Sequence, residues 1–322
     1  MPSTISDLKS TDDLRYPPSC LVVEIHPLER EVSVEVNDYF LQHWPFPDEK
    51  ARKKFVGSAF PRATCSLFPR ALNDRISFAC RLLTLLFLID DLLEDMSIED
   101  GRAYVENLIP ICRGDVRPDR SIPVEYMSWD IWESMRAHDL ELANAMLEPT
   151  FELLRAQTDP VRLEPKGFKE YLKYREIDVG NAILMSLMRF SMNLRISPED
   201  LTILDAAERN CSKHLSVLND IFSYEKEVFA SKTLHAEGGS LCSGVSTLSE
   251  AANIPTDAAK HVLYVLCREF ERTHEKLSQE ILDEVEDTEA VRAYLKGLEF
   301  QMSGNEAWTK NTMRYLDPSM EC

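Results

Sequence analysis

The chain has 322 residues, a formal net charge of −19, 44% hydrophobic residues and only 10 glycines. The negative charge opposes binding to nucleic acid or to anionic membranes, because both require clustered lysine and arginine. The hydrophobic content is sufficient for a sizeable core. The low glycine content and the scarcity of alternating valine, isoleucine and threonine runs predict an all-α fold.

The cysteines and the apolar segments indicate the compartment. Eight cysteines are scattered through the chain without a C-x-x-C pair or a histidine at zinc-finger spacing, so we interpret them as reduced thiols. Residues 1–16 lack the apolar core of a secretory signal. The longest apolar run, 82–89, is far shorter than the ~20 residues that a membrane span needs. These features predict a cytoplasmic protein with no membrane span.

The N-terminal half shows helical periodicity after a polar start. Residues 1–25 include Pro17-Pro18 and are expected to form a loose tail, followed by a single domain over 26–322. A long helix is predicted over 73–95, with Asn73 as a candidate cap. Further helices are predicted over 126–147 and 151–157, with a break at Pro149. A connecting loop is predicted by three prolines: Pro110, Pro118 and Pro123.

The C-terminal half continues the helical pattern. Residues 167–194 contain Gly180, which costs ~1 kcal/mol relative to alanine in a helix interior, so a break is expected there. Pro198 suits the first turn of a helix that continues to residue 228. Residues 232–245 hold three of the ten glycines and are the candidate for a mobile lid. Helices over 256–281 and 288–312 complete the chain.

Three oxygen-bearing side chains recur at intervals of four residues. On a helix, each step from Asn219 to Ser223 to Glu227 rotates the side chain by only ~40°, so the three form one stripe. An amide oxygen, a hydroxyl and a carboxylate suit a hard divalent cation that shares its remaining positions with phosphate oxygens. The stripe therefore predicts Mg²⁺ and a diphosphate.

A second acidic cluster lies far upstream. Asp90 and Glu94 share one helix face directly after an apolar stretch, and two such carboxylates repel each other unless a cation or a proton neutralises them. Taken alone, the cluster is equally compatible with a solvated helix end. The presence of both motifs in one helical chain favours a metal site.

The two motifs, D-D-L-L-E and N-D-x-x-S-x-x-x-E, resemble the metal motifs of class I terpene synthases. Arg175, 44 residues before Asn219, matches the diphosphate-sensing arginine of that family, with Asp178 linking it to a helix break near Val179-Gly180. Each cation singly would be an ordinary surface charge, but an anion with three or more charges suits guanidinium, ammonium and phenol donors. Three further positions match the family's diphosphate donors: Lys226, Arg314 and Tyr315.

The resemblance is closest to fungal aristolochene synthases and extends from about residue 26 to 315. It is carried by the stretches 78–84, 132–139 and 301–306. It implies a helical bundle around a single apolar cavity, with farnesyl diphosphate as substrate and three Mg²⁺ ions at the cavity mouth. The implied metal ligands are Asp90, Asn219, Ser223 and Glu227, and the implied diphosphate contacts are Arg175, Lys226, Arg314 and Tyr315.

Aromatic residues near the motifs bear on the product. Phe87 and Trp308 are candidates to stabilise carbocations through the ring face, with plain core packing as the alternative. The chain departs from the aristolochene-forming pattern where a tyrosine and a phenylalanine are usual. We therefore expect either aristolochene with more early-terminating by-products or a different sesquiterpene. The departures are Leu67 and Leu153, together with Asn181 and Asp95 near the expected cavity mouth.

Two other functions fit a helical chain of this kind. A chain-elongating prenyltransferase shares the allylic ionisation, but such enzymes normally carry a second D-D-x-x-D cluster where this chain has the Asn219 stripe. A non-catalytic helical binding protein would be expected to have lost at least one metal or phosphate position, and all eight are present. The sequence leaves the oligomeric state open, with a homo-oligomer as one alternative.

Overall fold

The computed structural model describes residues 16–164, 167–234, 236–285 and 288–315, and these contain helices and no β-strand. The predicted all-α fold is confirmed. The helices are α1 (Glu29–His43), α2 (Glu49–Ser58), α3 (Phe60–Leu67), α4 (Ile76–Glu94), α5 (Ile98–Arg113), α6 (Pro123–His138), α7 (Leu140–Asn144), α8 (Leu147–Gln157), α9 (Phe168–Asp178), α10 (Asn181–Met192), α11 (Pro198–Thr233), α12 (Gly244–Ala252), α13 (Thr256–Glu284) and α14 (Thr288–Thr309). Short 3₁₀ turns are η1 (Pro160–Leu163), η2 (Glu237–Gly239) and η3 (Met313–Tyr315).

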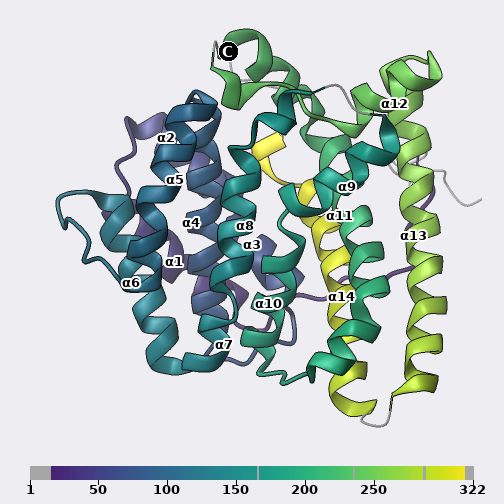
Figure 1. Cartoon of the computed structure of the whole chain (residues 1–322), viewed down its shortest axis with the longest axis horizontal. Coiled ribbons are helices and arrows are strands. Elements are labelled where there is room, and N and C mark those ends of the chain that lie inside the picture. The colour runs from purple at the N-terminus through teal and green to yellow at the C-terminus, as the bar shows by residue number, and fades with distance from the viewer. Residues whose placement is uncertain (1–15, 165–166, 235, 286–287, 316–322) are drawn as a thin grey trace, which may run out of the picture.

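The helices form a bundle with the elements of the site near its centre. Figure 1 shows α11, α14 and α13 running side by side along one flank, while α1, α5 and α6 cover the other. Between the flanks, α3, α4, α8 and α10 supply apolar side chains to one continuous core. None of the described helices is both long and apolar enough to cross a membrane.

Several predicted boundaries in the N-terminal half are wrong. The helix expected from Asn73 begins at Ile76, and no side chain caps it. Pro110 lies inside α5 rather than in a loop. The helix expected over 126–147 is divided at Asp139, whose side chain accepts a hydrogen bond from the Leu142 amide. A local side-chain bond of this kind competes with helix continuation, and periodicity alone does not report it.

Pro149 is a further correction. It lies in the first turn of α8, where its missing amide hydrogen is not needed, rather than between two helices. The break at Gly180 is confirmed, because this residue has φ 78° and separates α9 from α10. Pro198 occupies the first turn of α11, as predicted, and α11 extends for 36 residues to Thr233.

Parts of the predicted lid and of the predicted N-terminal tail make specific contacts with the bundle. Gly238 in η2 donates its amide to the Met96 carbonyl at 3.0 Å, so the glycine-rich segment rests on the end of α4. Residues 16–20 lie on α13, where Ser19 donates to Glu271 at 2.8 Å. Residues 1–15 of the expected loose tail lie outside the described residues.

Candidate active site

An apolar cavity of about 210 Å³ lies at the centre of the bundle and ends in polar residues at its mouth. The apolar part of its lining comes from α3, α4, α8, α10, α11 and α14. It includes Leu67, Leu86, Phe87, Leu153, Ile183, Leu215 and Trp308. Water is poorly retained against such walls, and a hydrocarbon chain is favoured there.

The three members of the oxygen stripe lie on α11, the single helix that their spacing required, and they face the mouth of the cavity. Asn219, Ser223 and Glu227 all line the cavity. The Ser223 hydroxyl donates to Glu227 Oε1 at 2.5 Å, which shows that successive members of the stripe are within contact distance. The stripe therefore offers three oxygen ligands from one rigid helix.

The first acidic motif faces this stripe from the end of α4. Asp90, Asp91 and Glu94 bring carboxylate oxygens within 4.8 Å of one another. Lys226 of α11 donates to Glu94 at 2.7 Å, and Arg314 of η3 donates to Asp91 at 2.8 Å. Two of the predicted diphosphate-binding cations are therefore paired with the first motif.

Arg175 connects α9 to the middle of α11. Its Nη2 donates to Asn219 Oδ1 at 2.8 Å, and its Nη1 contacts Asp178. The Asn219 amide in turn donates to the Tyr315 hydroxyl at 2.8 Å. The structure thus brings together all eight residues that the sequence singled out for metal and diphosphate, and all of them line the cavity.

The donor set fits a divalent cation. Glu227 Oε2 is buried and has no hydrogen-bond partner among the described residues. Burial, and then the nearby Asp220 carboxylate, raise the pKa of Glu227 to about 7. Burial and the Glu94 carboxylate similarly raise the pKa of Asp90 to about 6. Crowded, desolvated carboxylates of this kind favour a bound cation, which would relieve both effects.

Both aromatic candidates lie in the cavity wall. The Phe87 ring stacks on Phe60 with centroids 4.6 Å apart, and Trp308 lies 5.5 Å from Phe87. The Trp308 indole donates to the Ser58 carbonyl at 2.9 Å, which fixes the orientation of its ring. Phe87 and Trp308 therefore form an aromatic part of the wall, supported by the Phe60 ring, and the Arg314 guanidinium lies 5.4 Å from the Phe87 ring centroid.

The four departures from the expected pattern lie in different places. Leu67 and Leu153 line the cavity as aliphatic surface. Leu153 also lines a second hollow on the outer side of the α9–α10 break, together with Asn181. Asp95 is exposed at the end of α4 and is not part of the cavity wall.

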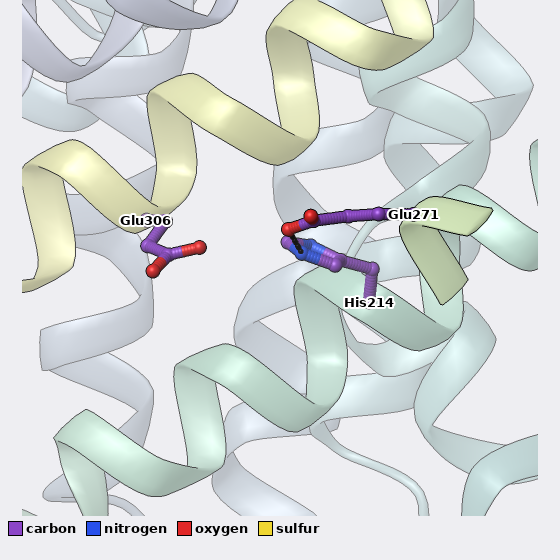
Figure 2. A group of neighbouring side chains, drawn as sticks. All are labelled: His214, Glu271 and Glu306. Carbon is purple, nitrogen blue, oxygen red and sulfur yellow. Dashed lines mark ion pairs between the residues drawn. The ribbon is translucent and has the colours of Figure 1, made fainter. Parts of the chain in front are cut away.

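A second polar cluster lies deeper, between α11, α13 and α14. Figure 2 shows His214 and Glu271 facing one another, with the Glu306 carboxylate opposite them. Arg268 contacts Glu271 at 3.0 Å and also pairs with Glu306. A guanidinium cation therefore already bridges the two carboxylates, and we interpret this cluster as a buried ion-pair network.

Sequence reasoning missed two polar residues of the cavity wall. Gln157 donates to Asp90 Oδ1 at 2.9 Å, and Arg162 donates to the Gln157 carbonyl at 2.7 Å. Gln157 is the last residue of α8 and Arg162 lies in η1, where no motif or periodicity identifies them. The contact of Gln157 with Asp90 at the end of α4 brings them to the mouth.

Comparisons with known proteins agree with this geometry. Residues 81–273 match the family model described as terpene synthase family 2, C-terminal metal binding. A (+)-aristolochene synthase of Penicillium expansum is 60% identical over 299 residues, which is 93% of this chain and 90% of that protein. An aristolochene synthase of Aspergillus terreus is 58% identical over 306 residues, covering 95% and 96% of the two chains.

The chain belongs to the terpene synthase family. It is a sesquiterpene cyclase of the aristolochene synthase-like group. The crystal structure of aristolochene synthase from Penicillium roqueforti superposes with a TM-score of 0.82 at 51% identity, over 92% of this chain and 99% of the other. A hedycaryol synthase bound to nerolidol shares the fold at 18% identity, with a TM-score of 0.72 over 91% and 99% of the two chains. Membership of the terpene synthase family implies a prenyl diphosphate as substrate.

Proposed function

We propose that the enzyme binds farnesyl diphosphate with three Mg²⁺ ions and converts it to aristolochene with early-terminating by-products. The observation that supports this most directly is the mouth of the cavity. There, oxygen ligands from α4 and α11 face each other among four diphosphate donors, directly above an aromatic and aliphatic pocket. The relatives of known product, at 58% and 60% identity, support aristolochene in particular.

We assign the metal sites to Asp90 on one side and to Asn219, Ser223 and Glu227 on the other. When bound there, Mg²⁺ neutralises the charge that develops on the departing diphosphate. Arg175, Lys226, Arg314 and Tyr315 bind the outer oxygens of the diphosphate and hold the allylic carbon over the pocket. Because Lys226 and Arg314 are paired with the first motif, substrate binding exchanges those ion pairs for contacts with the diphosphate.

The side chains that line the cavity below its mouth control which product the carbocation forms. The ring faces of Phe87 and Trp308 stabilise positive charge at about 2 kcal/mol or more per contact when desolvated. Gly238, Gly239 and Ser240 also line the cavity, so the segment around η2 borders the mouth and excludes water. The smaller Leu67 and Leu153 give later cations less aromatic stabilisation, which favours early deprotonation.

Incubation of the purified enzyme with farnesyl diphosphate and Mg²⁺, followed by gas chromatography and mass spectrometry of the volatiles, tests this proposal. We expect aristolochene as the main hydrocarbon, accompanied by a germacrene-type product. Absence of any cyclic hydrocarbon would contradict the proposal. A parallel incubation with added isopentenyl diphosphate should give no longer prenyl diphosphate, which separates cyclisation from chain elongation.

We also propose that the enzyme works in the cytoplasm. The five buried cysteines among the described residues carry free thiols, and a reducing compartment preserves that state. Fluorescence microscopy of the tagged enzyme in its host cell tests the location. A homo-oligomer stays a prediction, which light scattering of the purified protein would test.

A further inference from the structure

Asp220 belongs to the second predicted metal motif but lies outside the cavity that Asn219, Ser223 and Glu227 line. One residue along a helix rotates the side chain by about 100°, so Asp220 cannot share the face of Asn219. Asp220 is fully buried, with 0% exposure, and it is absent from the cavity wall that Asn219 and Ser223 line. A buried carboxylate at this position needs partners within the protein.

Three donors from two other helices converge on this carboxylate. The Tyr171 hydroxyl of α9 donates to Oδ2 at 2.6 Å, and the Gly244 amide of α12 donates to the same oxygen at 2.9 Å. Arg175 Nε donates to Oδ1 at 3.2 Å. Asp220 therefore joins α9, α11 and α12 at one point behind the cavity mouth.

The contact between Asp220 and Arg175 holds the Nε side of the guanidinium and leaves its two terminal nitrogens for a diphosphate. The terminal nitrogens of Arg175 contact Asp178 and Asn219, both of which line the cavity. A diphosphate at the mouth would take these terminal nitrogens, while Asp220 keeps Nε. A planar guanidinium held at Nε presents its two-nitrogen fork in one direction.

The contact with Gly244 fixes the end of the segment that borders the mouth. Gly244 is the first residue of α12, and a Cβ on it would lie 2.8 Å from Asp220 Oδ2. Only glycine therefore allows the amide this close to the carboxylate. The preceding segment, 236–243, contributes Gly238, Gly239, Ser240 and Cys242 to the cavity wall.

We propose that Asp220 is a positioning residue for the diphosphate site. It holds the fork of Arg175 toward the cavity and anchors the segment 236–243 at its C-terminal end. The inference rests on the proposed function in one respect, namely that the anion at the mouth is a diphosphate. It requires neither a particular prenyl chain nor a particular product.

Binding of inorganic diphosphate in the presence of Mg²⁺, measured by calorimetry, tests the first part. Asp220→Asn keeps the shape of the side chain and removes its charge, so affinity should fall roughly 10- to 100-fold, the range for a lost charged hydrogen bond. In an Arg175→Ala background the same substitution should have little further effect, because it acts through Arg175. Additive losses in the double variant would overturn the proposal. Glu225→Gln, an exposed change on the same helix, is the control and should bind as wild type.

Hydrogen exchange of the segment 236–243 tests the second part. Gly244→Ala displaces the carboxylate without changing its charge, and it should speed exchange in this segment while leaving α13 unchanged. Unaltered exchange in both the Gly244→Ala and the Asp220→Asn proteins would overturn the anchoring role. If Asp220→Asn fails to fold, Tyr171→Phe removes one hydrogen-bond donor to Asp220 and is combined with Arg175→Ala in the same double-variant cycle.

Neither diphosphate binding nor hydrogen exchange depends on product formation. A wild-type enzyme that binds diphosphate but forms no cyclic hydrocarbon would contradict the proposed function and leave the role of Asp220 open to these same measurements. Normal cyclisation combined with additive losses in the double variant would contradict the role of Asp220 alone.

Discussion

Arg314 Nη2 lies 3.0 Å from Asp90 Oδ2, so a proposed diphosphate-binding cation is paired with a proposed metal ligand. We therefore expect binding of the metal and binding of the anion to depend on each other. A Mg²⁺ ion at Asp90 would displace Arg314, and that displacement should be favourable once a diphosphate accepts the guanidinium.

We predict that Mg²⁺ and inorganic diphosphate bind cooperatively. Mg²⁺ alone should raise the melting temperature only slightly, and both together should raise it by several degrees more. Arg314→Gln frees Asp90, so it should strengthen binding of Mg²⁺ alone by roughly tenfold and weaken binding in the presence of diphosphate, on the scale of one charged hydrogen bond. Calorimetric titrations measure both effects. Equal Mg²⁺ affinity with and without diphosphate would contradict the coupling.

Substitution of the stripe on α11 should remove turnover without unfolding the protein. Asn219→Ala and Glu227→Ala each delete an oxygen ligand, and we expect product formation to fall below detection. The Oε2 atom of Glu227 is buried and has no hydrogen-bond partner in the part of the chain that the structure describes, so loss of this carboxylate should leave the melting temperature unchanged or raised. Circular dichroism and product analysis together check this. A retained turnover in Glu227→Ala would remove that residue from the metal site.

Restored aromatic surface should shift the product. Leu153→Phe and Leu67→Tyr place ring faces in the wall where the chain has aliphatic groups, and we expect a larger share of aristolochene relative to early hydrocarbons. A gain of about 1 kcal/mol for a late cation would change that ratio roughly fivefold. Chromatographic product ratios at equal turnover measure the effect. Phe151→Leu, a change in the core outside the cavity wall, controls for altered packing.

The loss of folding stability at acid pH should depend on Glu306. Burial alone would raise its pKa, but hydrogen bonds from Lys310, Tyr264 and Arg268 outweigh burial and lower the pKa to about 2, from an ordinary value of 4.5. Because the folded-state pKa is depressed, the stabilisation is present above pH 4.5 and is lost as the pH falls toward 2. Glu306→Gln should therefore lower the free energy of unfolding by on the order of 2–3 kcal/mol at neutral pH.

Melting temperatures of the wild type and of Glu306→Gln between pH 7 and pH 3 provide the measurement. The difference between the two proteins should stay constant from pH 7 to about pH 4.5 and shrink as the pH falls further toward 3. Glu269→Gln removes an exposed ion pair with Arg272 on α13 and should show no such trend. A constant difference at every pH would show that Glu306 stabilises by shape rather than by charge.

Gly238 should be essential for exclusion of water. A Cβ on this residue would lie 2.0 Å from the Leu93 carbonyl oxygen, so Gly238→Ala must lift the segment 236–243 from the end of α4. We expect farnesyl-derived alcohols to appear among the products as water captures the cation. Gly167→Ala meets only the flexible Glu170 side chain and serves as the control. An unchanged hydrocarbon-to-alcohol ratio in Gly238→Ala would exclude a sealing role for this segment.

Much of the fold and the site could be predicted because their signals are local. The spacing of Asn219, Ser223 and Glu227 places them on one face of any helix. A glycine inside a helical pattern favours a break at its own position, as Gly180 does. The division at Asp139 could not be predicted, since it depends on a single side-chain bond to the Leu142 amide. The sequence did not predict a role for Gln157 or Asp220 for a related reason. Gln157 depends on a tertiary contact with Asp90, and Asp220 depends on one with α12.

Leu153 separates two hollows, the reaction cavity on one side and the outer pocket at the α9–α10 break on the other. It belongs to α8, whereas the residues proposed to bind the metal and the diphosphate belong to α4, α9, α11 and η3. Substitutions at this one position can reshape the space available to a carbocation while leaving the ionising machinery untouched. Such separation gives this enzyme a short evolutionary route to new hydrocarbons, in which each step retains a working first reaction.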